Sequence, residues 1–147
     1  MQSPRRYPMV AAAVAIVAIT LATPVVLAQT QTPAAPAVYF INLKDRDIVT
    51  SPFRVQFGLS GMGIAPAGVE KEKTGHHHLL VDTKLSAEEL KGAIPNDQQH
   101  LHFGGGQTET MLTLPPGEHT LQLVFANWSH VPFDPPIMSP IITVTVR

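Results

Sequence analysis

Proline and glycine divide this chain into short segments, and this division constrains the fold more than any other feature of the sequence. The 147 residues include 14 prolines and 10 glycines, which end or interrupt regular elements. The runs between them are rich in β-branched and aromatic residues, and they cover residues 38–43, 53–60, 76–83, 107–114, 119–126 and 141–146. Their spacing and alternation predict an all-β fold, a single immunoglobulin-like antiparallel β-sandwich of about seven strands.

One segment carries a helix signal. Ser86 and Glu89 stand three residues apart, as in a capping box, and Gly92 follows as a stop signal. The segment is too short for a packed helix. We therefore expect one short helical turn within a loop.

Residues 1–28 have the order of a secretory signal peptide. Arg5 and Arg6 precede an apolar run that ends in small residues at Ala28. An uncleaved membrane anchor is the alternative, because the run is almost long enough to span a bilayer, although Pro24 near its end favours cleavage. The adjacent arginines leave the choice between general secretion and twin-arginine export open. We expect a periplasmic or secreted protein with no membrane span after cleavage.

Cleavage would leave a chain of single-domain length. Residues 29–36 read QTQTPAAP and predict an extended linker, so the β-sandwich domain is assigned to residues 37–147. The chain has no cysteine, which excludes thiolate ligands and a cysteine nucleophile. No basic stripe marks a nucleic-acid partner.

The histidines are the main chemical feature of the chain. Four of the seven form two His-x-His pairs, His76 with His78 and His100 with His102. Alternate residues of a strand point to the same face, so each pair can direct two imidazoles toward one ion. Both pairs fall on the more polar side of their runs, whereas His77 alternates with them and is expected to face the core.

Imidazole nitrogens are preferred ligands of the late transition metals. Because the chain lacks cysteine, a copper or zinc ion is the natural cofactor to expect. The predicted ligands are the two pairs, His76, His78, His100 and His102. Possible additional ligands are His119, His130 and Met111. Two carboxylates are candidates for orienting the imidazoles, namely Asp82 and Glu109.

Two other interpretations of the histidines stay open. They could form a hydrogen-bond network that stiffens a polar strip, or a pH-sensitive surface. His119 begins a strand after a turn, a position that favours a structural hydrogen bond at a sandwich corner. His130 lies in a proline-rich loop, where the sequence does not decide between a ligand and a structural residue.

The sequence gives little support for an enzyme. The glycines of residues 104–106 lack the Lys-Ser/Thr that follows in a phosphate-binding loop. The chain also has no serine-centred elbow and no H-E-x-x-H helix. We therefore predict a non-catalytic metal-binding domain. The alternative is a structural or interaction module of the cell envelope, whose partner would be a protein or an envelope polymer.

Five segments resemble a known family of small secreted bacterial domains. They are GHHHLLVD, HLHFGGGQTE, LPPGEHTLQLVFAN, SHVPFDPPIMS and ITVTV, and the resemblance runs over residues 38–146. The chain is thus similar to the domain-of-unknown-function 4399 family. The resemblance implies a compact extracytoplasmic β-domain with histidine-rich motifs, and it implies no activity, substrate or ligand. At matched positions it marks His76, His77, His78, His100, His102, Gly104, Gln107, Glu109, His119 and His130.

Overall fold

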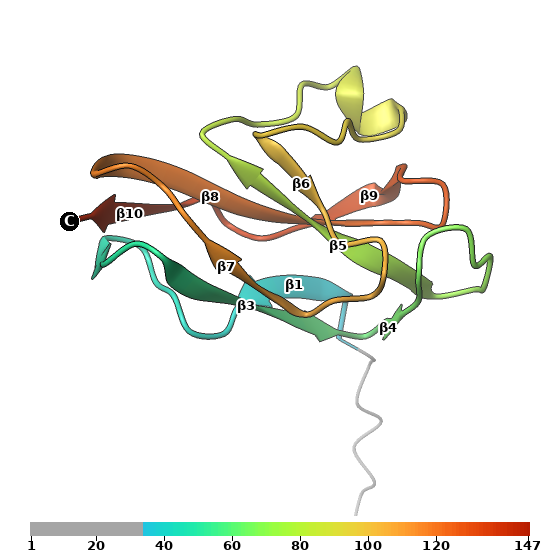
Figure 1. The fold of residues 1–147 in the computed structure, drawn as a ribbon. Coiled ribbons are helices and arrows are strands. Elements are labelled where there is room, and N and C mark those ends of the chain that lie inside the picture. The colour runs from blue at the N-terminus through green and yellow to red at the C-terminus, as the bar shows by residue number, and fades with distance from the viewer. Residues whose placement is uncertain (1–33) are drawn as a thin grey trace, which may run out of the picture. The chain divides into compact units, whose positions relative to one another are not determined.

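Ten strands and one short 3-10 helix make up the described part of the chain, residues 34–147 of a computed structural model (Figure 1). Six of the strands correspond to the runs expected from the sequence: β1 (Ala37–Phe40), β3 (Phe53–Ser60), β5 (Thr74–Val81), β7 (Glu109–Leu112), β8 (Gly117–Ala126) and β10 (Ile142–Val146). A seventh, β6 (His100–His102), is the strand that the second His-x-His pair implied. The prediction of an all-β fold is confirmed.

The expected number of about seven strands was too low. The structure adds three strands, β2 (Asp47–Val49), β4 (Gly63–Ile64) and β9 (Pro132–Met138). The first two are too short to show an alternation in sequence. The third contains three prolines, which a strand tolerates only at a sheet edge or a bulge. Its pairing with β8 indeed carries a register shift between Phe125 and Ala126.

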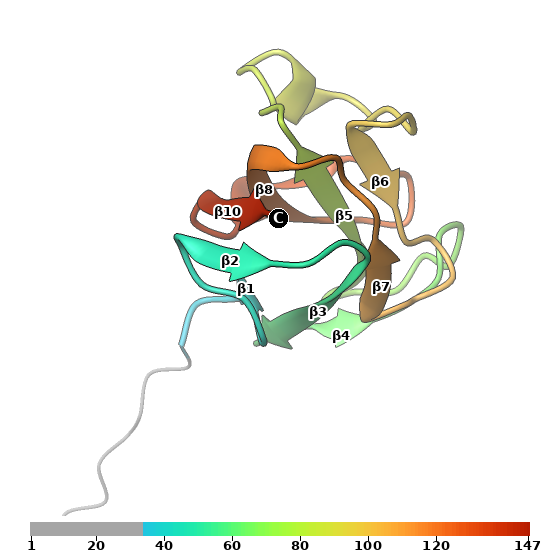
Figure 2. The same ribbon diagram turned by 60° about the vertical axis from the view of Figure 1, so that its left-hand side comes forward.

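The strands form two sheets that face each other (Figure 2). The smaller sheet has the order β1-β3-β7, and the larger has the order β2-β10-β8-β5-β4. In the larger sheet β6 also pairs with β5, and β9 pairs with β8. Most pairs are antiparallel, whereas β2 runs parallel to β10 and β4 parallel to β5. This order gives the immunoglobulin-like sandwich, with β10, β8 and β5 opposite the smaller sheet.

Strand β5 is buried on both of its faces along almost its whole length. The inner face, with Leu79 and Val81, contributes to the main core between the sheets. On the outer face, Leu80 belongs to a second apolar cluster with Leu85 and Ile94. The last two residues lie in the connection between β5 and β6, which arches over the larger sheet (Figure 1). A sheet face that would ordinarily meet solvent is therefore covered.

The predicted helical turn lies in this same connection. It is the helix η1 (Glu89–Lys91). The Glu89 carboxylate accepts the Ser86 backbone N–H at 2.7 Å, and the Ser86 hydroxyl accepts the Glu89 backbone N–H at 3.3 Å. These are the two reciprocal bonds of the expected capping box.

The predicted signal peptide, residues 1–28, lies outside the described residues, as do residues 29–33 of the predicted linker. Residues 34–36 are exposed and precede β1. Among residues 34–147, no helix combines the length and apolar character that crossing a membrane requires.

Candidate metal centre

Three of the predicted histidine ligands are brought together by the pairing of β5 with β6. His78 lies directly opposite His102 in the antiparallel register, and His76 lies two residues before His78 on the same face of the sheet. The fourth member of the group is His130, from the loop of residues 127–131 between β8 and β9. This loop begins directly after Ala126, which pairs with His76.

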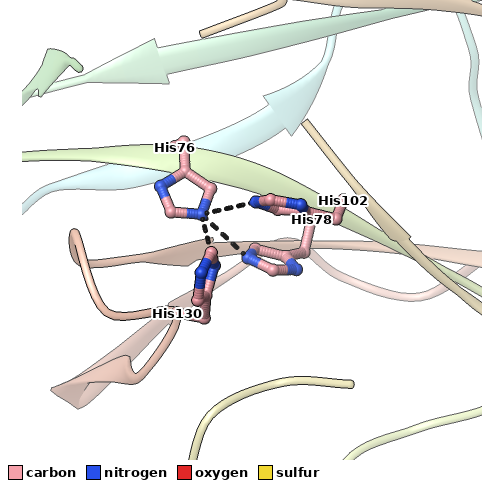
Figure 3. A group of neighbouring side chains, drawn as sticks. All are labelled: His76, His78, His102 and His130. Atoms are coloured by element: carbon pink, nitrogen blue, oxygen red, sulfur yellow. Dashed lines mark hydrogen bonds between the residues drawn. The ribbon is translucent and has the colours of Figure 1, made fainter. Parts of the chain in front are cut away.

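The four imidazoles converge on the side-chain nitrogen of His76 (Figure 3). The Nε2 atom of His76 lies 3.2 Å from Nε2 of His78, 3.2 Å from Nε2 of His102 and 3.2 Å from Nδ1 of His130. One nitrogen from each ring lies within 4.8 Å of the others. Nitrogens placed tetrahedrally 2.0 to 2.1 Å from a zinc ion lie about 3.3 Å apart. The spacing around His76 therefore approaches that of a metal site.

A hydrogen-bond network accounts for only part of this convergence. A neutral imidazole nitrogen has either one proton or one lone pair. The Nε2 atom of His76 can therefore make only one full hydrogen bond, yet three ring nitrogens lie at 3.2 Å from it. A second or third contact would have to share that one proton or lone pair, which weakens each bond. A cation among the four nitrogens would accept all of their lone pairs.

Burial favours the neutral form of three of these imidazoles, those of His76, His78 and His102. His76 is 0% exposed and His78 is 1% exposed. Desolvation, followed by the neighbouring histidines, lowers the pKa of His76 to about 4 and the pKa of His78 to about 3. Burial also lowers the pKa of His102. The neutral ring is the form that binds a metal, and the lowered pKa values of these three rings favour that form at neutral pH.

His102 and His130 are only half-buried and form the more open side of the group. The His102 ring lies against Gly104, where an added Cβ would meet two atoms of the ring. The missing side chain of this glycine leaves room for the His102 imidazole.

His77 points to the opposite face of β5, as its alternation with the pair predicted. Its ring packs between Phe57 and Phe125, with ring centroids 5.2 and 5.3 Å away. Both ring nitrogens are buried and have no hydrogen-bond partner among the described residues. Burial lowers the pKa of His77 to about 4. His77 is thus a core residue and is not part of the group of four histidines.

His100 is on the expected face of the sheet but is not a member of the group. It pairs with Leu80, two residues beyond His78 along β5. Its Nδ1 lies 2.9 Å from Asp97 Oδ1, an oxygen that also accepts the backbone N–H of His100. A four-ligand site from both pairs would need His100 opposite His78, which is a register shifted by two residues. His130 joins the group instead.

His119 and Asp82 form a separate unit at the other end of β5. The Nδ1 of His119 lies 2.7 Å from Asp82 Oδ2, and its Nε2 lies 2.9 Å from the carbonyl oxygen of Pro115. The hydrogen bond that His119 donates to Asp82 is the main reason that the pKa of His119 is raised. Asp82 therefore orients His119 and not an imidazole of the four-histidine group. His119 has the structural position that its sequence context favoured.

Glu109 and Met111 lie in β7, on the outer face of the smaller sheet. Met111 is exposed and pairs with Arg54. The Glu109 carboxylate accepts a hydrogen bond from Gln56 Nε2 at 3.0 Å and lies 3.9 Å from the Arg54 guanidinium. The inner face of this sheet is filled by core residues such as Val55, so neither side chain reaches the histidines.

Comparison with known proteins identifies a family to which no activity is assigned. The family model described as "Domain of unknown function (DUF4399)" matches residues 55–147. This range begins within β3 and includes all four histidines of the group. No curated protein and no solved structure matches the chain significantly.

Proposed function

The chain belongs to the DUF4399 family, and we propose that its domain binds one late transition-metal ion through His76, His78, His102 and His130. The observation that carries the proposal is the approach of three ring nitrogens to 3.2 Å from His76 Nε2. One nitrogen can satisfy only one of them by hydrogen bonding. A bound cation would satisfy all four.

Copper or zinc is the ion that this donor set favours. All four donors are neutral imidazole nitrogens, which suit zinc, copper and nickel and compete poorly for calcium or magnesium. The 3.2 Å spacing around His76 Nε2 is close to that of a tetrahedral site and suits a d¹⁰ ion such as Zn(II) or Cu(I), because neither ion prefers a square-planar arrangement.

A binding role without catalysis follows from the number of donors. Catalytic zinc sites have three protein ligands and keep one position for water, whereas sites with four protein ligands are closed. Four imidazoles would leave no position for a substrate. We therefore propose that the domain stores, delivers or senses the ion, in the periplasm or outside the cell as the signal-like residues 1–28 favour.

A structural or interaction module of the envelope is the second candidate, and it is favoured by the short nitrogen-to-nitrogen contacts themselves. If one contact of His76 is a true hydrogen bond, the group could stiffen the junction of β5, β6 and the loop of residues 127–131. One measurement separates the two candidates, because only a metal-binding domain would bind an added ion tightly.

The test is a calorimetric titration of the untagged, chelator-treated chain with Zn(II) and with Cu(II) at pH 7.5. We expect one ion per chain, and no binding to a His76→Ala variant, which lacks the central nitrogen. His100→Ala is the matched control, because it removes a histidine of the same sheet face that lies outside the group. Equal heats from the wild type and His76→Ala would refute the proposal.

A further inference from the structure

One of the four proposed ligands is not positioned by a strand. His76 and His78 lie in β5 and His102 lies in β6, so the ladder hydrogen bonds fix their spacing. His130 lies in the loop of residues 127–131 between β8 and β9. The geometry of this loop therefore decides whether the site has three imidazoles or four.

The backbone of His130 has an uncommon conformation. Its φ angle is 68°, in the left-handed region that residues other than glycine seldom adopt. Such a conformation costs free energy and persists only where the surrounding structure requires it. The loop must therefore contain interactions that hold it.

The turn is closed by backbone bonds at Asn127. The His130 N–H donates to the Asn127 carbonyl at 3.0 Å, and the Asn127 N–H donates to the Val131 carbonyl at 3.0 Å. The His130 carbonyl accepts the Ile94 N–H at 3.0 Å, which connects the loop to the segment that covers the larger sheet.

The side chain of Asn127 adds three bonds to one atom. Its Oδ1 accepts the Ser129 backbone N–H at 2.9 Å, the Ser129 hydroxyl at 2.8 Å and the Val131 backbone N–H at 3.1 Å. Ser129 and Val131 are the residues directly before and after His130. A single oxygen atom thus fixes the chain on both sides of the fourth ligand.

We propose that Asn127 is the positioning residue of the metal site, and that its side-chain oxygen sets His130 as the fourth ligand. This inference rests on the proposed metal binding. Without the oxygen, the loop would lose the bonds on both sides of His130 and relax from the left-handed conformation. The three strand histidines would remain, so the ion would have three imidazole ligands.

The test compares Asn127→Ala, His130→Ala and the double variant in the full chain. Zn(II) affinity is measured by competition with a chelator, and the number of coordinated nitrogens by paramagnetic resonance of the Cu(II) form. We expect Asn127→Ala to bind Zn(II) about 10- to 100-fold more weakly, the usual loss when a residue that orients a ligand is removed. Its Cu(II) spectrum should match that of His130→Ala.

Two comparisons separate positioning from a general loss of stability. Asn127→Asp keeps an acceptor oxygen and should restore the wild-type Cu(II) spectrum. The double variant should bind no more weakly than His130→Ala, because Asn127 acts only through that ligand. A further loss in the double variant, or a wild-type spectrum for Asn127→Ala, would overturn the inference.

Ser129→Ala decides the matter if Asn127→Ala does not fold. It removes only the hydroxyl donor to Asn127 and should shift the Cu(II) spectrum part of the way toward that of His130→Ala. An unchanged spectrum would overturn the inference. Failure of the proposed function itself is distinguishable, because the wild-type chain would then bind neither ion.

Discussion

Histidines lie at or beside both ends of strand β5, and their surroundings are opposite. At one end, His76 and His78 face other imidazoles, and their pKa values fall to about 4 and about 3. At the other end, His119 contacts the Asp82 carboxylate and the Pro115 carbonyl, and its pKa rises. The imidazole ring thus favours the neutral form at one end of the strand and the protonated form at the other.

Desolvation by burial is the main cause of the lowered pKa values of His76 and His78, and the atoms that face each ring add to the difference. Both nitrogens of His119 meet oxygen acceptors, and only the imidazolium can donate to both at once. The central nitrogen of His76 meets three other nitrogens instead, so added protons would repel one another. One end of the strand therefore favours a proton on the ring, whereas the other favours free lone pairs directed at a shared cation.

Acid should produce the largest effect that separates the two ends. His76, His77 and His78 have lowered pKa values in the fold, so the unfolded chain binds more protons below pH 6.5. The metal-free protein should lose roughly 1.4 kcal/mol of unfolding free energy per pH unit for each such histidine, as pH falls from 6.5 toward 4. Urea unfolding in the presence of a chelator at pH 7, 6 and 5 measures this loss.

A constant unfolding free energy over this range would contradict the neutral state of the buried rings. The metal-loaded protein supplies the comparison. Because the ion binds only the neutral rings, it should protect the fold at pH 7 and lose this effect as the rings become protonated.

Replacing His77 should reverse the usual result of a core substitution. The ring of His77 is buried among aromatic side chains with both nitrogens unpaired, and burying a polar group without a partner costs about 1 to 3 kcal/mol. His77→Phe should therefore raise the unfolding free energy at pH 7 by about 1 to 2 kcal/mol. Urea unfolding measures the gain.

Metal affinity is the control for this variant, because His77 lies on the other face of β5 from the group. His77→Leu serves as a second variant, in case the phenylalanine ring overfills the space. Lower stability in both variants would show that the unpaired nitrogens have partners in solution.

The face of the sheet, but not the register, could be predicted from the sequence. Alternation placed His76, His78, His100 and His102 on one side and His77 in the core, because side chains alternate along any strand. The pairing of β5 with β6 is set by long-range packing. A shift of two residues preserves the face of every side chain and yet places His100 opposite Leu80. Sequence periodicity has no information on such a shift.

His130 and strand β9 were difficult for a related reason. The loop of residues 127–131 reaches His76 because Ala126 pairs with that residue, a contact between segments some fifty positions apart in sequence. Strand β9 contains Pro135 and Pro136, which argue against a strand in the absence of a known sheet edge. In contrast, the six strands that match the runs expected from the sequence follow from local alternation and composition.

Gly104→Ala should weaken metal binding by about tenfold, in the range that residues orienting a ligand usually contribute. An added Cβ at this position would meet the His102 ring and would move one of the four nitrogens. Gly92→Ala is the matched control, because no atom lies within 4 Å of its added Cβ. Zn(II) competition titrations measure both variants, and equal affinities would mean that the loop shifts without moving His102.

His119→Gln should have the smallest effect, and its pH dependence is the informative part. The raised pKa of His119 means that its contribution to stability is complete below pH 6.5 and is lost as pH rises through the raised value. The variant should therefore lose about 1 kcal/mol relative to the wild type at pH 6, and less at pH 9. This trend is opposite to that of the buried rings at the other end of β5. Urea unfolding at both pH values measures the difference, and a penalty that grows toward pH 9 would mean that His119 is neutral beside Asp82.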